Sequence, residues 1–171
     1  LEHNLVTLRF KVPLFVRSQH HRHRTWSYNE ISRRYTGETL EFYEPQLYRT
    51  QHKSNRQASN ENDLIDPVII PDLSDSSVGL TASHCMLKHH ELSVRFYRDL
   101  IKNGVCREQA RGVLPQNLYT EYYGTVNLNN LIKFIDLRID SHAQWEIQKV
   151  AEACKKIATD LWPIAMSHFK A

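Results

Sequence analysis

Arg22-His23-Arg24-Thr25-Trp26-Ser27-Tyr28-Asn29-Glu30-Ile31-Ser32-Arg33-Arg34-Tyr35 is the stretch on which the interpretation of this chain depends. It combines four arginines with three aromatic residues, and Gln19, His20 and His21 stand just upstream. The planar guanidinium group of arginine binds phosphate through two parallel hydrogen bonds. Aromatic rings beside such a group suit a flat heterocycle. The stretch therefore predicts a site for a nucleotide, a flavin or an RNA base.

The size and composition of the chain are those of one soluble globular domain. It has 171 residues, of which 41% are apolar and 24% are charged, and its formal net charge is +3. So small a charge argues against a dedicated DNA-coating protein. No apolar run approaches the roughly 20 residues that a membrane helix needs, and no signal-peptide pattern opens the chain. These properties predict a cytoplasmic protein.

The three cysteines do not form a recognisable framework. Cys85, Cys106 and Cys154 are odd in number, lie far apart and include no pair separated by two residues. Neither a set of disulfides nor a zinc knuckle is expected from this spacing. The sequence therefore predicts reduced thiols.

The first third of the chain predicts one clear strand and several loops. Apolar residues alternate with polar ones over residues 6–12, which is typical of a strand with one buried face. Pro13 ends it and suits the start of a short helix over residues 14–21. Ser27 and Glu30 fit a helix-capping box, but the absence of a helical apolar stripe after it favours a loop that leads into a strand over residues 39–43. Residues 51–63 are polar without an apolar period and predict a surface loop or a partly disordered insert within a loop-rich region, 49–77.

The remainder is dominated by helices. A long helix is expected over residues 78–103, capped by Asp75, Ser76 or Ser77 and ended by Gly104. Its predicted apolar stripe consists of Cys85, Met86, His89, Leu92, Phe96, Tyr97, Leu100 and Ile101. A short helix over 107–113, a strand over 117–126, a helix capped by Asn127 and a helix capped by Ser141 come next, before Pro163 interrupts the tail. This order, without alternating strand–helix–strand units or repeats, predicts an α+β fold in a single domain.

The opening stretch also resembles a known signature. It is similar to the pattern RHRxxSxNExSxRY of the flavin-dependent thymidylate synthases, and a second block over residues 108–119 and 137–148 is similar to the C-terminal half of that family. The fixed positions of the pattern are all present as Arg22, His23, Arg24, Ser27, Asn29, Glu30, Ser32, Arg34 and Tyr35. The resemblance implies a central mixed or antiparallel sheet with long helices packed on it. In that family further residues precede the first strand, so an N-terminal part is expected to be missing here.

The resemblance implies a defined reaction. It is the conversion of dUMP to dTMP, with methylenetetrahydrofolate as carbon donor and reduced FAD, regenerated by NADPH, as hydride source. No enzyme nucleophile is needed. A serine nucleophile requires an activating base, for which His23 is the candidate, but no recognisable nucleophile elbow surrounds Ser32, so Ser32 is interpreted as a nucleotide-binding hydroxyl. The family further implies a homotetramer with active sites between subunits.

The resemblance also assigns residues. Those expected to bind FAD are Arg22, His23, Arg24, Glu30, Asn127, Leu128, Asn129, Lys133 and His142. Those expected to bind dUMP are Gln19, His20, His21, Arg22, Glu30, Ile31, Ser32, Arg33, Arg34, Arg111 and Arg138, with residues 30–34 contributed by a neighbouring subunit. Lys133 stands where relatives often carry a shorter polar side chain such as asparagine, and Asn127 opens a helix whose N-terminus favours phosphate.

Arg138 is the residue expected to take part in catalysis. In the resembling family the matching arginine contacts the uracil ring and favours ionisation at its N3, a task that suits a fixed cation. The alternative is an ion-pair network at a helix end with Asp136 and Asp140. A similar alternative for Arg111 is a surface pair with Glu108.

Two other functions are compatible with the residues alone. An RNA-binding module would use the interleaved arginine, histidine and aromatic side chains of residues 19–35, and its binding would depend steeply on salt. A metal protein would use His20, His21 and His23, although no cysteine or HExxH pattern supports it. Both rank below the enzyme because neither accounts for the matched signature.

Overall fold

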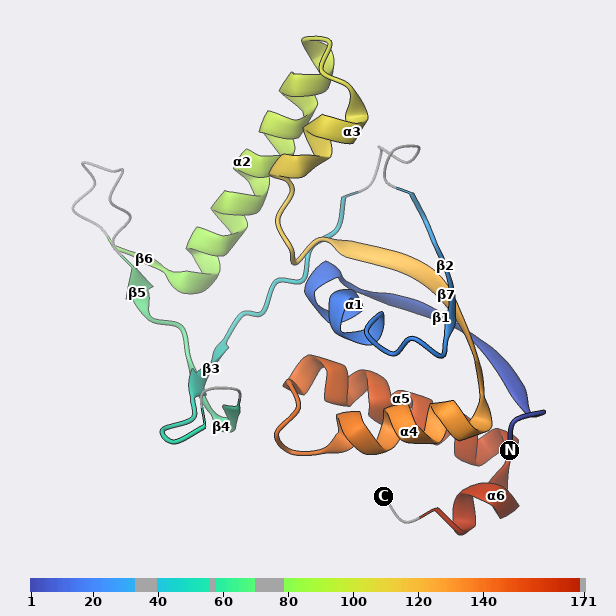
Figure 1. Ribbon diagram of the computed structural model, residues 1–171. Helices are drawn as coiled ribbons and strands as arrows, with labels where there is room; N and C mark the ends of the chain where they lie inside the picture. The colour runs from blue at the N-terminus through green and yellow to red at the C-terminus, as the bar shows by residue number, and fades with distance from the viewer. Residues whose placement is uncertain (33–39, 56–57, 70–78, 170–171) are drawn as a thin grey trace.

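The computed structural model describes residues 1–32, 40–55, 58–69 and 79–169. At its centre is a three-stranded antiparallel sheet in the order β1-β7-β2, formed by β1 (Leu5–Pro13), β7 (Tyr119–Asn127) and β2 (Ser27–Glu30). Helices α1, α4 and α5 lie below this sheet in the view of Figure 1, and α2 extends away from it. The predicted α+β class, with helices packed on an antiparallel sheet, is confirmed.

β1 forms as its alternation predicts. Phe10 and Val12 are buried, whereas the intervening Arg9 and Lys11 are exposed. Pro13 then acts as the N-cap of α1 (Leu14–His20), which confirms the predicted short helix. Gly124 on β7 faces the ring of Phe10 so closely that an added Cβ would lie 3.0 Å from it. The chain thus passes from a buried strand directly into the helix that leads to residues 22–24.

The predicted loop over Ser27–Glu30 is wrong, because these residues form β2. They pair with β7 in antiparallel register from Ser27 opposite Thr125 to Glu30 opposite Tyr122. Half of the strand is exposed, so it lacks the apolar alternation that would reveal it in the sequence. Of the strand expected over 39–43, residue 39 lies outside the described residues, and Phe42 forms only an isolated bridge to Leu118. Glu30 therefore stands at the end of an ordered strand.

Helices α4 and α5 form most of the layer beneath the sheet. α4 (Leu128–Ile139) and α5 (Trp145–Leu161) pack side by side, and α6 (Pro163–Ser167) follows the break at Pro163. The predicted cap at Asn127 is confirmed, since its side chain accepts a hydrogen bond of 2.9 Å from the Asn130 amide. The predicted cap at Ser141 is wrong, because α5 begins after Gln144. The core consists mainly of Phe10, Val16, Trp26, Tyr122, Leu128, Leu131, Phe134, Ile135, Ile147 and Ala151.

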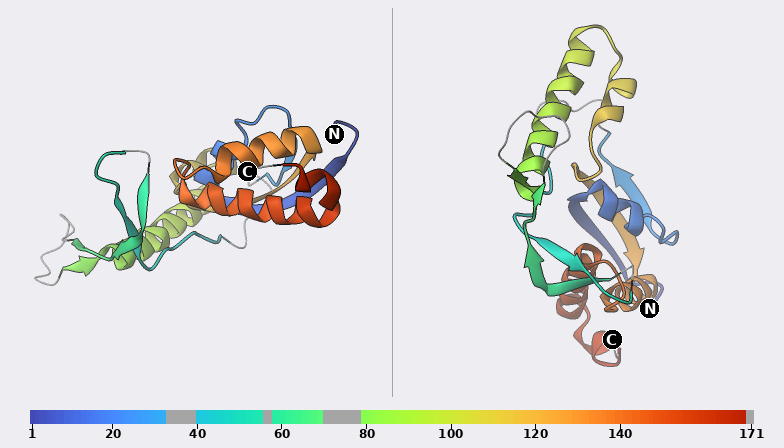
Figure 2. Two further views of the ribbon diagram at one scale, coloured as in Figure 1. Left: turned by 90° about the horizontal axis from the view of Figure 1, so that it is seen from below. Right: turned by 90° about the vertical axis from the view of Figure 1, so that its left-hand side faces the viewer.

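α2 (Ala82–Lys102) stands apart from this core, as Figure 2 shows from two further directions. Thr81 caps it, and the predicted caps at 75–77 lie outside the described residues. α3 (Arg107–Ala110) and a 3-10 turn η1 (Arg111–Val113) fold back against it after Gly104, whose φ of +88° suits glycine. The predicted apolar stripe is only partly correct. Leu92 and Phe96 are more than half exposed, and the buried positions are His90, Ser93 and Tyr97.

The side chain of His90 connects α2 to the rest of the fold through two hydrogen bonds and a ring contact. Its Nδ1 lies 2.6 Å from a carboxylate oxygen of Glu44, and its Nε2 lies 2.5 Å from the Asn117 side-chain amide. The ring also stacks on Phe42 at 4.4 Å between centroids. A buried imidazole with both nitrogens bonded holds the middle of α2 against the segment that enters β7.

The predicted surface loop over residues 51–63 is only partly correct within the described residues: residues 52–55 form a loop, but residue 51 and residues 59–63 lie in strands. β3 (Tyr48–Gln51) and β4 (Ser59–Ile65) form an antiparallel hairpin, and β5 (Val68–Ile69) pairs with β6 (Leu80–Thr81). Most of β4 is exposed, so its polar residues give no periodic signal. Among the described helices, none combines the length and apolar character needed to cross a bilayer.

Candidate active site

A polar cavity of about 530 Å³ opens between α1, the end of β2 and the turn η1. Four residues predicted to bind dUMP line it together: Glu30, Ile31, Ser32 and Arg111. Leu14, Leu114 and Leu118 supply apolar wall. The arrangement arises because Ile31 extends β2 by donating its amide to Glu121, while η1 leads through Pro115 into β7. Segments far apart in sequence thus converge on one cavity.

Glu30 is the most constrained side chain of this cavity. Its Oε2 accepts a 2.9 Å hydrogen bond from Arg17 Nε and a second bond from Arg17 Nη2. Its Oε1 accepts a 2.7 Å hydrogen bond from the Thr120 hydroxyl. Sequence reasoning missed Arg17 and Thr120, because their partnership with Glu30 joins a helix to two strands and follows no spacing along the chain.

Arg111 faces the same cavity from η1 and is exposed. Glu108 also lines the cavity, but the two side chains form no ion pair. In the part of the chain that the structure describes, no carboxylate pairs with Arg111, Arg22 or Arg24. The surface pair considered for Arg111 is therefore wrong.

Arg138 reaches His23 from the last turn of α4. Arg138 Nε donates a 3.0 Å hydrogen bond to His23 Nε2, so the imidazole accepts at that nitrogen and is neutral. Burial first, and then the charge of Arg138, lowers the pKa of His23. Burial and the neighbouring charge of Arg22 lower the pKa of Arg138. Two guanidinium groups thus lie near each other beside a neutral histidine.

The ion-pair network considered for Arg138 is not formed among the described residues. Asp140 instead accepts from the His142 backbone amide at 2.8 Å and contacts its Nδ1 at 2.7 Å. These two hydrogen bonds lower the pKa of Asp140. His142 lies in the turn after α4, with 74% of its side chain exposed, so it is available to a ligand.

His20 and His21 occupy positions that the sequence did not suggest. His20 has no exposed surface, its Nδ1 lies 2.8 Å from the Tyr122 hydroxyl, and its Nε2 has no partner. Burial lowers the pKa of His20 to about 3. His21 stacks on Tyr28 at 4.0 Å. His20 therefore packs in the core, and the expectation that its side chain contacts dUMP finds no support in this arrangement.

The same packing bears on the two lower-ranked functions. Trp26 is buried and Tyr28 is half-buried against His21, so these rings do not present faces for RNA bases. Tyr35, the third aromatic residue of the stretch, lies outside the described residues, as do Arg33 and Arg34. Within the described ranges, no three histidine, cysteine, aspartate or glutamate side chains are placed to hold a metal ion.

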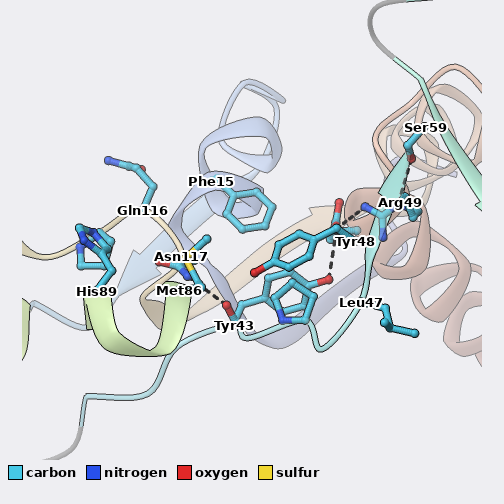
Figure 3. A pocket seen from close by; sticks show the side chains of 13 residues that line it. Phe15, Tyr43, Leu47, Tyr48, Arg49, Ser59, Met86, His89, Gln116 and Asn117 are labelled. Atoms are coloured by element: carbon cyan, nitrogen blue, oxygen red, sulfur yellow. Dashed lines mark hydrogen bonds and ion pairs between the residues drawn. The ribbon is translucent and has the colours of Figure 1, made fainter. Parts of the chain in front are cut away.

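Gln19 leads to a second, aromatic cavity of about 530 Å³, shown in Figure 3. The side-chain amide of Gln19 donates a hydrogen bond to Gln144 Oε1, and Gln144 Nε2 donates a 2.9 Å hydrogen bond to Glu146. Glu146 Oε1 also accepts a 2.5 Å hydrogen bond from Arg49 Nη2. Burial alone would raise the pKa of Glu146, but the hydrogen bonds from Arg49 and Gln144 lower it. Rings of Phe15, Tyr43 and Tyr48 form the walls, and Gln116 lines both this cavity and the polar one.

Two predicted flavin residues, Leu128 and Asn129, lie at the end of α4 opposite Arg138, and Lys133 lies midway along the helix. Leu128 is fully buried, and its amide donates to the Asn4 carbonyl at 2.8 Å. Asn129 is half-buried and Lys133 is exposed. The helical rise places Leu128 and Arg138 roughly 15 Å apart along the axis. A ligand that contacts both ends must therefore be elongated.

Comparison with known proteins gives a consistent result. The family model described as "Thymidylate synthase complementing protein" matches residues 1–164. Proteins named flavin-dependent thymidylate synthase are similar to this chain: the one from Thermus thermophilus is 42% identical over 160 residues, 94% of this chain and 54% of its own length. The one from Thermotoga neapolitana is 40% identical over 162 residues, 95% of this chain and 65% of its own length. The chain thus spans between about half and two thirds of these relatives.

A solved structure is similar as well. The crystal structure of the UMP/dUMP methylase PolB from Streptomyces cacaoi, bound with 5-Br UMP, superposes with a TM-score of 0.78 at 30% identity. The match covers 98% of this chain and 73% of PolB. The matched family model, the relatives and the superposed fold agree with the signature in residues 22–35. This chain belongs to the thymidylate synthase complementing protein family, the family of the flavin-dependent thymidylate synthases.

Proposed function

We propose that this chain contributes the nucleotide site of a flavin-dependent thymidylate synthase that converts dUMP to dTMP. Methylenetetrahydrofolate is the carbon donor, and NADPH reduces the FAD. The observation that carries the proposal is the polar cavity in which Glu30, Ile31, Ser32 and Arg111 meet. The relatives bear the name of this enzyme, and PolB binds a uridine monophosphate analogue, which supports a uracil nucleotide as substrate.

The cavity has the features that a nucleoside monophosphate requires. Arg111 offers a guanidinium group without a carboxylate partner in the described part of the chain, which suits phosphate. Glu30 offers acceptor oxygens for hydroxyl or N–H groups, and the leucines offer an apolar wall for the ring or sugar. Arg33 and Arg34 are assigned to the same nucleotide by the signature.

The residues around Arg138 fit FAD. Arg22 and Arg138 carry like charges close together, with no acidic partner among the described residues, and such a pair is stabilised by a bound anion. The exposed His142 and the N-terminal half of α4, with its cap Asn127 and with Asn129 and Lys133, suit an elongated dinucleotide. When bound, FAD supplies hydride to the uracil ring.

The protein's own residues bind and orient the nucleotide and polarise its uracil ring. Arg138 stabilises negative charge on the uracil ring without giving up its own proton. His23, neutral and bonded to Arg138 Nε, holds that guanidinium in place. Ser32 binds the nucleotide.

The proposed reaction needs no nucleophile from the enzyme, and the described cysteines agree with this. None of the three lines the polar cavity, and burial raises the pKa of the Cys154 thiol to about 12. A thiol so protonated at neutral pH does not attack a pyrimidine ring.

We further propose that the enzyme acts as a homotetramer with sites between subunits. Leu92 and Phe96 leave an apolar stripe exposed on α2, away from the core of this chain, and such a stripe suits contact with another subunit. Sedimentation of the FAD-loaded protein tests this, and a monomer that is nevertheless active would contradict it.

The reaction is tested by adding FAD, NADPH, methylenetetrahydrofolate and dUMP tritiated at C5, and following tritium release together with dTMP. Formation of both supports the proposal. Protein that binds FAD and dUMP yet yields neither product would contradict it. The similar enzyme from Thermotoga neapolitana, assayed in parallel, serves as the positive control.

A further inference from the structure

The polar cavity contains a carboxylate at a place where a phosphate monoester is proposed to bind. Glu30 and Glu108 both line it, alongside Arg17 and Arg111. A phosphate monoester carries close to two negative charges at neutral pH. A carboxylate without compensation would repel such a ligand, so the charge of Glu30 must be offset by a cation.

Arg17 is placed to do this. It projects from the middle of α1 and binds Oε2 of Glu30 through both Nε and Nη2, a fork rather than a single contact. The Thr120 hydroxyl fixes the other oxygen at 2.7 Å. The Arg17 and Glu30 side chains are 35% and 20% exposed, so the pair is partly removed from water but still faces the cavity.

We propose that Arg17 is a positioning and charge-compensating residue of the nucleotide site, an inference that rests on the proposed function. It fixes the Glu30 carboxylate as a hydrogen-bond acceptor for the substrate. It also cancels the charge of that carboxylate, so that the cavity accepts a nucleoside monophosphate. Without Arg17, the three remaining charged side chains that line the cavity, Glu30, Glu108 and Arg111, would sum to a net negative charge.

A second arginine–glutamate pair of the sheet provides a matched control. Arg9 on β1 binds Glu121 on β7 through Nε at 3.1 Å and through Nη2, the same fork on the same carboxylate type. The Arg9 side chain is 66% exposed, and neither Arg9 nor Glu121 lines the polar cavity. If forked pairs in this sheet mattered only for folding, Arg9 and Arg17 would behave alike.

The test is isothermal titration of dUMP into the full chain, loaded with FAD, for the wild type and four variants: R17Q, R17K, E30Q and the double variant R17Q/E30Q. We expect R17Q to weaken dUMP binding about 10- to 100-fold, because it removes a charge-assisted fork and leaves Glu30 uncompensated. R17K keeps the charge and loses the fork, so we expect a loss below about tenfold. R9Q, the control, is expected to bind dUMP like the wild type.

The double variant decides the mechanism. Because E30Q removes the repelling charge, R17Q/E30Q is expected to bind dUMP at least about threefold more tightly than R17Q alone. If R17Q binds as the wild type does, or if the losses of R17Q and E30Q simply add, the inference is overturned. Wild-type protein that binds no dUMP would instead contradict the proposed function itself. Thermal melts of each variant separate lost binding from lost folding.

Discussion

The two cavities that meet at Gln116 have the same volume, about 530 Å³, but one arginine in each, Arg49 and Arg111, is placed in the opposite way. In the aromatic cavity Arg49 is occupied by Glu146 and lies 4.7 Å from the Trp145 ring. In the polar cavity Arg111 has no carboxylate partner among the described residues. Arg49 is therefore expected to stabilise the fold, whereas Arg111 is expected to bind a ligand. This contrast leads to separate expectations for the two sites.

The largest effect on activity is expected for Arg138, whose guanidinium group is hydrogen-bonded to His23 rather than paired with a carboxylate. R138A removes the cation that stabilises the uracil anion, and we expect kcat to fall about 100- to 1000-fold. Tritium release from C5 measures it. R98A, on the exposed face of α2, is the control. Retention of more than a tenth of the wild-type kcat by R138A would argue against a catalytic role.

Arg111 and Arg49 should separate binding from stability. R111A is expected to weaken dUMP binding about 10- to 100-fold, because the phosphate loses a charge-assisted hydrogen bond. Its free energy of unfolding should change by less than about 0.5 kcal/mol, since an exposed side chain without a partner is removed. Calorimetric titration and urea unfolding provide the two values. Equal dUMP affinity of R111A and the wild type would be the contrary result.

R49A should give the reverse pattern. Arg49 and Glu146 are 20% and 11% exposed, so removing Arg49 leaves a largely buried carboxylate without its cation. We expect the free energy of unfolding to fall by about 2 kcal/mol and dUMP affinity to stay within about threefold of the wild type. Urea unfolding checks the first value. A loss of dUMP affinity equal to that of R111A would remove the distinction between the cavities.

The last expected effect concerns stability alone and is a pH dependence that originates in the core. The folded-state pKa of His20 is about 3, below its unfolded value of about 6.5, so the unfolded chain binds more protons between these values. Stability is therefore expected to fall as pH drops below about 6.5, by up to about 1.4 kcal/mol per pH unit from this residue. Urea unfolding from pH 7 to pH 5 should show a shallower slope for H20Q. An unchanged slope would show that His20 is not the group responsible.

The sequence predicted those parts of the fold whose signal is local. Alternation gave β1, the Asn127 side chain gave the start of α4, and Pro163 marked the break before α6. β2 was missed because Ser27–Glu30 becomes a strand only through pairing with β7, about a hundred residues later. Leu92 and Phe96 were expected to be buried, but they are exposed. A periodic pattern identifies the apolar face of a helix but does not say which element covers that face.

The candidate site was predicted through its signature rather than through geometry. Glu30, Ile31, Ser32 and Arg111 do line one cavity, but His20 lies in the core, since histidine spacing says nothing about burial. Arg17 was missed because its partner Glu30 is on another element. The assignment of individual residues to FAD and dUMP remains a prediction that the experiments above test.

The most direct test of the central claim is to titrate dUMP into the FAD-loaded protein while recording the flavin absorbance spectrum, for the wild type, R111A and R49A. If the polar cavity holds the nucleotide next to the flavin site, dUMP shifts the flavin bands in the wild type and R49A at similar concentrations. R111A then needs about 10- to 100-fold more dUMP for the same shift. A shift that is lost in R49A and unchanged in R111A would place the nucleotide in the aromatic cavity and contradict the account.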